Sequence, residues 1–214
     1  MERATPEAEA SLRLLHKIRF GSSPAEPVVF LVHGRRGNFD VMATFRRCFP
    51  DSWTLISVQA ILPEANGFSW WDISNPSPRG DIDHAYEVLR DFLTKACPFY
   101  GLTSTKKFAV GFSQGAALLS IYLQRSPAEL TGVGLLAGFV FSDKKKREDF
   151  TVLPKIFIAH GTTDEVVPIS KAKDGMKYLE QIGSRVTFVE DTVGHKVGVN
   201  GMNRLKEWVL DEGC

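Results

Sequence analysis

The sequence is poor in cysteine, in net charge and in long apolar runs, and each shortage excludes a class of protein. It has three cysteines, an odd number at wide spacing, which we expect to be reduced thiols in a cytoplasmic protein rather than a disulfide framework. These are Cys48, Cys97 and Cys214. The formal net charge is +1, from 26 basic and 25 acidic residues, so electrostatics does not favour a nucleic-acid partner.

Membrane and secretory signals are also missing. No apolar stretch approaches the roughly 20 residues that a bilayer-spanning helix needs. The N-terminus lacks the basic region and apolar run of a secretory signal. We therefore expect no stable membrane anchor. The one basic cluster, residues 143–149, is flanked by acids and is predicted to be a solvated loop, with a weak contact to an anionic surface as the alternative.

Motifs for cofactors are absent from the chain. There is no H-E-x-x-H, no paired Cys-x-x-Cys, no calcium loop of Asp, Asn and Gly, and no glycine-rich phosphate loop. We therefore predict a protein that works without a metal or an organic cofactor.

The remaining pattern is an alternation of strand-like and helix-like segments. With 214 residues and 43% apolar content, the chain can bury one core, and we expect one domain over residues 1–214. Strand-like runs, apolar without alternation and therefore suited to burial on both faces, lie at 27–32, 53–58, 107–110, 132–137, 155–159 and 186–189. An edge strand is expected within 12–20. No long insertion separates the strands, which predicts an α/β fold with no large cap and with an open site.

A serine stands where one of these strands passes into a helix. The segment Gly111-Phe112-Ser113-Gln114-Gly115 follows the apolar run at 106–110 and precedes a helix-like run at 116–119. A sharp strand-to-helix turn holds its serine in a strained conformation and exposes the hydroxyl, while the flanking glycines avoid a clash. This context favours a nucleophile over the alternative of an ordinary turn serine.

A nucleophilic serine needs a base and an acid that orients the base, and both follow in the chain. Asp164 comes after the strand-like run at 155–159, and His195 comes after the last one. The alternative for His195 is a surface loop histidine. Glu165 and Asp191 are reserve candidates for the acid. For His33 and His160, each at the end of a strand, we expect supporting roles.

Two backbone N–H groups are candidates to stabilise an oxyanion. One belongs to Gln114, directly after the serine, and the other to Arg35, in the glycine-containing loop after the first buried strand. The alternative is that Arg35 and Arg36 are simply solvated charges, although both descriptions can hold for Arg35 because the donor is backbone.

Aromatic residues are candidates for a substrate pocket. Trp70 and Trp71, in the segment 68–71 of a loop after the second strand, either wall an acyl pocket or pack against the core. Phe139 and Phe141, after the fourth strand, are further candidates for the same wall.

Several segments together resemble one known family. They are Leu31-Val32-His33-Gly34-Arg35, Gly37-Asn38, Asp40, Trp70-Trp71-Asp72, Gly111-Phe112-Ser113-Gln114-Gly115, Leu136-Ala137-Gly138-Phe139, Ala159-His160-Gly161, Asp164, Val166-Val167-Pro168 and Gly194-His195. In these segments the chain resembles the phospholipase/carboxylesterase family of α/β-hydrolases, which includes the acyl-protein thioesterases, over nearly its whole length.

The resemblance implies an α/β-hydrolase fold, a mostly parallel sheet with helices on both faces. It implies a triad of Ser113, Asp164 and His195 with backbone donors at Arg35 and Gln114. The implied reaction is hydrolysis of small-molecule esters or thioesters with small to medium acyl groups, without a cofactor. One departure is Arg36, where related bacterial enzymes commonly have glycine. It adds bulk and charge at the mouth of the site and puts the substrate preference in question.

Other functions compete with an esterase. A peptidase or acyltransferase could use the same scaffold, although a peptidase usually carries a larger cap. A non-enzymatic binding protein would be expected to have lost a member of the Ser, Asp and His set. A homodimer is left open by the sequence.

Overall fold

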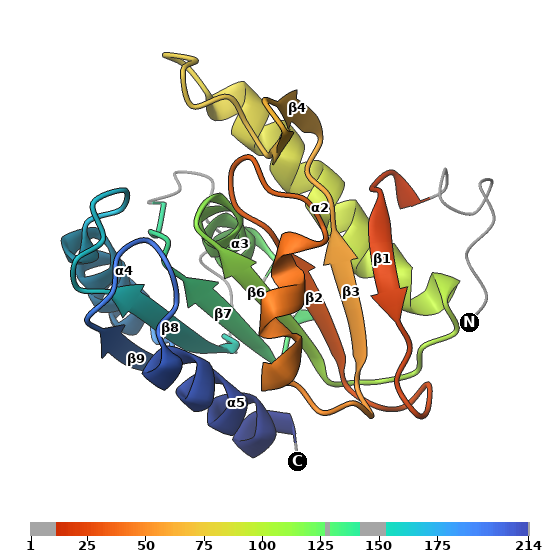
Figure 1. The fold of residues 1–214 in the computed structure, drawn as a ribbon. Helices are drawn as coiled ribbons and strands as arrows, with labels where there is room; N and C mark the ends of the chain where they lie inside the picture. Colours follow the sequence, from red (N-terminus) through yellow and green to blue (C-terminus); the bar gives the residue numbers. More distant parts are fainter. Residues whose placement is uncertain (1–11, 127–128, 142–152, 214) are drawn as a thin grey trace.

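The computed structural model describes residues 12–126, 129–141 and 153–213, and its elements follow one another as strands and helices in alternation (Figure 1). The basic run at 143–149 and Cys214 lie outside the described residues. The strands are β1 (His16–Arg19), β2 (Val28–Val32), β3 (Thr54–Val58), β4 (Leu62–Glu64), β5 (Gly67–Ser69), β6 (Lys107–Phe112), β7 (Gly132–Leu136), β8 (Lys155–Gly161) and β9 (Val186–Asp191). The helices are η1 (Val41–Cys48, a 3-10 helix), α2 (Arg79–Phe99), α3 (Gln114–Arg125), α4 (Ile169–Gln181) and α5 (Val199–Gly213).

Seven strands form the central sheet, in the order β1-β3-β2-β6-β7-β8-β9. Every neighbouring pair is parallel except β1 and β3, which are antiparallel. The predicted mostly parallel sheet is therefore confirmed. The expected edge strand is also present, as the four residues of β1.

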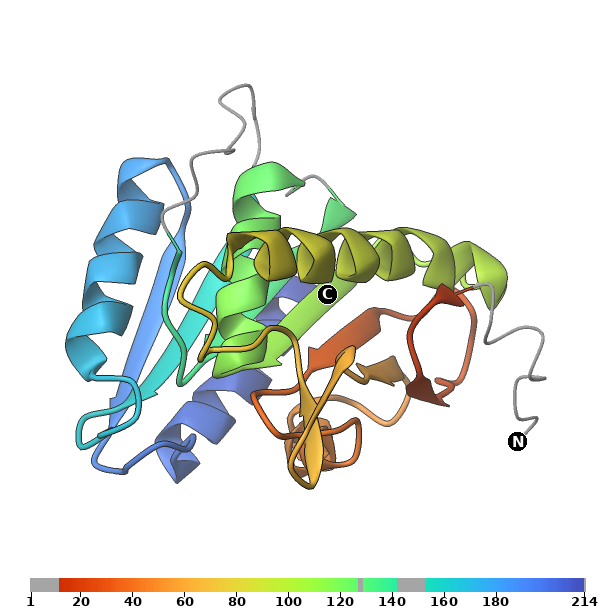
Figure 2. The same cartoon turned by 90° about the horizontal axis from the view of Figure 1, so that it is seen from above.

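Helices cover both faces of the sheet, as Figure 2 shows from above. Helices α2, α3 and α4 share one hydrophobic core, and η1 and α5 share the other. Strand β2 contributes side chains to both cores. Those of Val28, Phe30 and Val32 belong to the first core. Those of Val29 and Leu31 belong to the second. Because successive side chains of a strand point to opposite faces, a run of five apolar residues suits a strand buried on both sides.

The aromatic segment at 68–71 was expected in a loop, but it begins in a small hairpin formed by β4 and β5. The hairpin stands beyond the end of the main sheet (Figure 1). It is joined to the loop after β2, because the Phe68 N–H donates to the Gly37 carbonyl at 2.8 Å. Three-residue strands are too short to show a periodic pattern, which is why the sequence did not indicate them.

The three elements that carry the candidate Ser, Asp and His are brought to one edge of the sheet. Ser113 follows β6, Asp164 follows β8 and His195 follows β9, all at carboxyl ends of parallel strands. This edge is where open α/β sheets place their sites. Within the described parts of the chain, no helix is long and apolar enough to cross a bilayer.

Candidate active site

Ser113 occupies a strained turn between β6 and α3. Its backbone has φ +52° and ψ −114°, a conformation that residues with a side chain rarely adopt. Glycine is needed on both sides because the backbone is crowded. A Cβ on Gly115 would lie 2.3 Å from the Val32 carbonyl oxygen, and one on Gly111 would lie 2.6 Å from the Ala116 nitrogen. The turn therefore holds the serine at the carboxyl end of the sheet, as the motif predicted.

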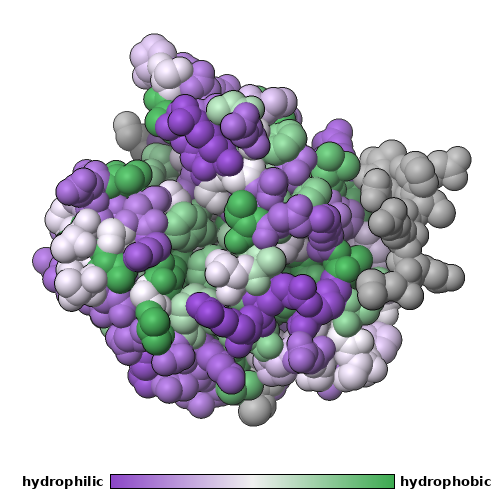
Figure 3. All heavy atoms as spheres, in the orientation of Figure 1, coloured by the Kyte–Doolittle hydropathy of each residue, from purple (hydrophilic) through white to green (hydrophobic). Residues whose placement is uncertain are grey.

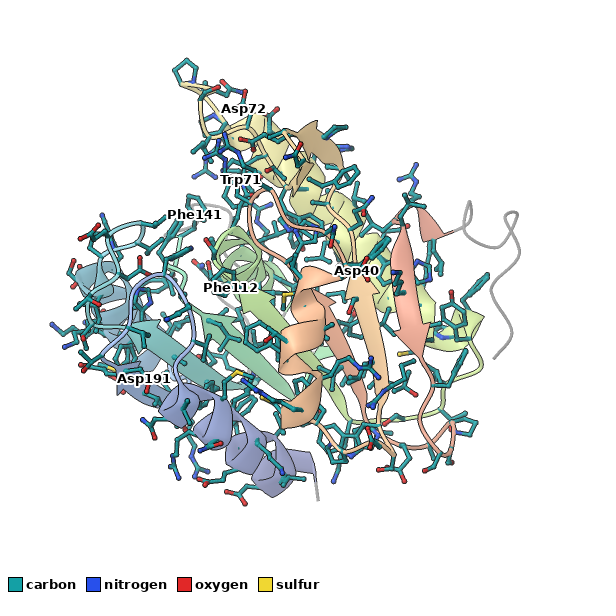
Figure 4. All side chains as sticks on the ribbon, viewed as in Figure 1. Asp40, Trp71, Asp72, Phe112, Phe141 and Asp191 are labelled. Atoms are coloured by element: carbon teal, nitrogen blue, oxygen red, sulfur yellow. The ribbon has the colours of Figure 1, made fainter. Side chains whose placement is uncertain are left out.

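Ser113, His195 and Asp164 form a chain of hydrogen bonds. The His195 Nε2 lies 2.9 Å from the Ser113 Oγ, and the His195 Nδ1 lies 2.7 Å from the Asp164 Oδ2. The ring of Phe112, labelled in Figure 4, packs beside the imidazole with 5.2 Å between ring centroids. The structure thus brings together three side chains that the sequence only suggested.

Asp164 is held as a buried carboxylate. Its Oδ1 accepts hydrogen bonds from the N–H groups of Val166 and Val167, each at 2.9 Å. Burial alone would raise its pKa, but these bonds and the one with His195 outweigh burial and lower the pKa below the ordinary value. The acid therefore remains ionised at neutral pH.

The two reserve acids lie elsewhere. Glu165 is exposed. Asp191, labelled in Figure 4 at the end of β9, accepts a 2.8 Å hydrogen bond from the Gly201 N–H in the first turn of α5. Its carboxylate therefore caps that helix rather than orienting His195.

Within the described residues, no three His, Cys, Asp or Glu side chains gather as a metal site would require.

His160 supports the loop that carries Asp164. It is buried, its Nε2–H donates to the Val167 carbonyl at 2.8 Å, and the same nitrogen lies 3.4 Å from the Asp164 Oδ2. The supporting role expected for this histidine is therefore confirmed.

Both candidate oxyanion donors lie beside the serine. The Gln114 N–H begins helix α3, where no carbonyl of the helix is available to accept it. Arg35 follows Gly34, and a Cβ on Gly34 would come within 3.1 Å of the Ser113 Cβ, so this loop touches the turn. Among the described residues, no acceptor binds the Arg35 N–H.

The Gln114 side chain has a second task that the sequence did not indicate. Its Oε1 accepts from the Trp70 N–H at 2.9 Å, and its Nε2 donates to the Trp71 carbonyl at 2.9 Å. The side-chain amide therefore both accepts from and donates to the backbone of the aromatic segment, and these two hydrogen bonds hold that segment against the serine turn.

His33 supports the loop that carries Arg35, as expected. Its Nε2 accepts the Ala60 N–H at 3.0 Å, so its Nδ1 carries the proton and donates to the Gly34 carbonyl at 2.7 Å. Burial lowers the pKa of His33, although the bond to Gly34 acts in the opposite direction. The ring is therefore neutral in the native protein.

We expect the stability of the protein to fall as the pH drops below about 6.5, because the unfolded chain binds a proton at His33 before the folded one does. One such proton contributes at most ~1.4 kcal/mol per pH unit to the free energy of unfolding. The measurement is urea unfolding between pH 8 and pH 5. The variant His33→Asn should show a smaller slope than the wild type. Equal slopes for wild type and His33→Asn would contradict the prediction.

The aromatic candidates separate into packing and surface residues. Trp70 has 0% of its surface exposed, and its Nε1–H donates to the His33 carbonyl at 2.8 Å. The packing alternative therefore holds for Trp70, which has no surface to offer a substrate. Trp71 is also buried but meets Phe141 edge-to-face at 5.8 Å, and Phe141 meets Phe139 at 4.9 Å.

Phe139 borders an apolar groove of about 490 Å³ beside the loop that carries Asp164. Val140, Val166, Val167 and Pro168 continue its apolar lining toward α4, where Lys171 and Asp174 add charged side chains. Figure 3 shows one face of the molecule, on which apolar side chains in the middle are surrounded by hydrophilic ones.

Comparisons with known proteins agree with the fold and with the family that the sequence resembles. Residues 15–210 match the phospholipase/carboxylesterase family. The chain is 25% identical over 193 residues to acyl-protein thioesterase 1 of Kluyveromyces lactis, covering 78% of this chain and 83% of that protein. It is 28% identical over 151 residues to a probable inactive carboxylesterase of Oryza sativa, covering 66% of this chain and 62% of that protein.

A solved structure shares the architecture. The carboxylesterase of Bacillus cereus superposes with a TM-score of 0.84 at 21% identity, covering 96% of this chain and 98% of the other. This likeness supports the α/β-hydrolase fold, because the two structures superpose over nearly the whole of both chains. The chain therefore belongs to the phospholipase/carboxylesterase family.

Proposed function

We propose that this protein is a serine carboxylesterase that cleaves esters of small to medium acyl groups through a covalent acyl-enzyme. The observation that carries the proposal is the chain of hydrogen bonds from Ser113 through His195 to Asp164. A serine hydroxyl alone is a weak nucleophile, and this arrangement supplies the base and the acid that activate it.

The proposed reaction proceeds in two halves. His195 Nε2 takes the proton of Ser113 as the oxygen attacks the acyl carbonyl, and Asp164 stabilises the resulting imidazolium. The proton then passes to the leaving alcohol or thiol as its bond to the acyl carbon breaks. Water repeats the sequence on the acyl-enzyme, with His195 again as base, and releases the acid.

The negative charge that develops on the carbonyl oxygen would be met by the N–H groups of Gln114 and Arg35. Both are backbone donors held in place before the substrate arrives, so they need no reorganisation during the reaction. The N-terminus of α3 adds a favourable dipole at the same point.

The proposed acyl site is the groove beside Phe139. Trp71 and Phe141 lie next to this border, since Phe141 meets both Phe139 and Trp71 edge-to-face. About 490 Å³ suits a small or medium acyl chain, within the usual range for small-molecule sites.

Two alternatives are distinguished by specific observations. An acyl-protein thioesterase would use the same groups, and the named Kluyveromyces lactis relative supports it. The Oryza sativa relative supports the second alternative, a non-enzymatic binding protein on this fold. Its name, a probable inactive carboxylesterase, shows that similarity to this family does not by itself establish catalysis. The complete hydrogen-bond chain in this molecule supports catalysis instead.

The test is hydrolysis of p-nitrophenyl esters from acetate to decanoate, with the matching thioesters in parallel. We expect activity with an optimum at short or medium chains. In addition, a fluorophosphonate should add its mass to the protein at Ser113, which peptide mass spectrometry would locate. No hydrolysis and no labelling would overturn the proposal in favour of a binding protein.

A further inference from the structure

The loop that carries Arg35 is tied to the β4–β5 hairpin through one carboxylate. Glu64, the last residue of β4, accepts hydrogen bonds from the Arg35 Nε at 3.0 Å, from the Arg35 Nη2, and from the Arg36 Nε at 2.9 Å. It also accepts the Ser69 hydroxyl at 2.6 Å. The description of Arg35 and Arg36 as simply solvated charges is therefore wrong, because both guanidinium groups bind Glu64.

The backbone of the loop is bound to the same hairpin. The Arg36 N–H donates to the Ser69 Oγ at 3.2 Å, so Ser69 links the loop backbone to Glu64. The hairpin passes so close that a Cβ on Gly67 would lie 2.1 Å from the Arg36 carbonyl oxygen. Side chain and backbone contacts thus converge on residues 35 and 36.

This loop needs an external restraint. Arg36 has φ +59°, in the left-handed region that favours glycine and is unfavourable for a long side chain. Such a conformation persists only where the surroundings hold it. The contacts with Glu64 and Ser69 supply that restraint. Among the described residues no acceptor binds the neighbouring Arg35 N–H, and the loop touches the serine turn at Gly34.

The carboxylate keeps its charge over the whole range in which an enzyme is assayed. Hydrogen bonds from Arg35 and then from Ser69 lower the pKa of Glu64 to about 2. The bidentate contact with Arg35 also gives the pair a defined geometry, which a single-point ion pair lacks. Glu64 is 23% exposed, and the Arg35 side chain is 32% exposed, so the pair is partly shielded from water.

We propose that Glu64 is a positioning residue that sets the direction of the Arg35 N–H in the oxyanion hole by holding residues 35 and 36 against the hairpin. The inference rests on the proposed esterase function. It assigns to the hairpin a role in the reaction rate, in addition to its contacts with the loop after β2.

The test is the variant Glu64→Gln, which keeps the shape but removes the charge and turns an amide N–H₂ toward the arginines. We expect kcat to fall about tenfold to a hundredfold with little change in KM, less than the 10²–10³ typical of losing an oxyanion donor outright. The affinity for an alkyl trifluoromethyl ketone should fall by the same factor. This inhibitor adds to Ser113 and places an oxyanion in the hole, so a purely structural role of Glu64 would not change its affinity selectively.

Asp72→Asn is the matched control. It removes the same charge close to the hairpin, but its carboxylate binds only the N–H and hydroxyl of Ser74 among the described contacts, each at 2.8 Å. We expect wild-type kcat and inhibitor affinity for this variant. Ser69→Ala is a second test if Glu64→Gln fails to fold, and it should lower kcat and inhibitor affinity together.

The outcomes separate the two proposals. A wild-type protein that neither hydrolyses esters nor reacts with a fluorophosphonate would overturn the proposed function. An active wild type, with Glu64→Gln equal to it in kcat and in inhibitor affinity, would overturn the role of Glu64 alone. The same holds if Glu64→Gln lowers only the melting temperature.

Discussion

Replacing Ser113 by alanine is expected to lower kcat roughly a million-fold, to the residual rate that binding and the oxyanion donors supply without a nucleophile. The proposed mechanism forms a covalent bond to the Ser113 Oγ, which lies 2.9 Å from the His195 Nε2, and no other hydroxyl of the described residues is hydrogen-bonded to that nitrogen. The measurement is single-turnover hydrolysis of the best p-nitrophenyl ester, with protein in excess so that a very slow rate remains visible.

This variant should keep its fold. Alanine also has a Cβ and meets the same backbone strain at φ +52°, and the N–H of residue 113 still donates to the Leu136 carbonyl. The exposed Ser170→Ala in the first turn of α4 is the control and should retain full activity. A loss of less than about tenfold in Ser113→Ala, with the protein folded, would exclude Ser113 as the nucleophile.

Replacing Asp164 by asparagine is expected to lower kcat about ten-thousand-fold. The asparagine amide cannot stabilise the imidazolium, and its N–H₂ favours the tautomer of His195 that carries its proton on Nε2. That tautomer cannot accept the proton of Ser113. The measurement is kcat at neutral pH with the same ester.

Asp191→Asn is the matched comparison, because Asp191 is the other carboxylate that the sequence offered near His195. It should weaken the cap on α5 and lower the melting temperature, with activity close to that of the wild type, since its carboxylate binds Gly201. If Asp191→Asn lost more activity than Asp164→Asn, the assignment of the acid would be wrong.

The lowered pKa of Asp164 makes the stability of the folded protein depend on pH in the acidic range. Its contribution to stability is fully present above the ordinary value of 3.8 and is lost as the pH falls through the lower pKa of the folded protein. Asp164 therefore does not titrate between pH 5 and pH 8, and any change of activity in that range must arise from another group.

Local sequence patterns were sufficient to predict the strands of the sheet, because a strand buried on both faces is a continuous apolar run. The apolar runs at 27–32 and 155–159 became β2 and β8, with ends within two residues of the expected positions. The β4–β5 hairpin could not be predicted from such a pattern. Its strands have three residues each, and its position depends on contacts with the loop after β2.

Only those parts of the candidate site that depend on neighbouring residues could be predicted with the same clarity. Ser113 stands in a local motif, so its setting was visible in a few residues. Asp164 was the preferred acid, but Glu165 and Asp191 stayed as reserve candidates because all three are near the ends of strands. The direction of each side chain decides between them, and the bond from His195 to Asp164 spans 31 residues of sequence.

The sequence by itself determined the mostly parallel sheet, the serine at a strand-to-helix turn and the family, because hydrophobic periodicity and turn chemistry act over a few neighbouring residues. The tertiary structure alone decided that Trp70 packs in the core, that the Gln114 amide holds the aromatic segment, and that Glu64 binds two arginines 28 and 29 residues away. Charged and polar side chains find such partners only after the sheet has formed, since their pairing depends on which loops its edge brings together.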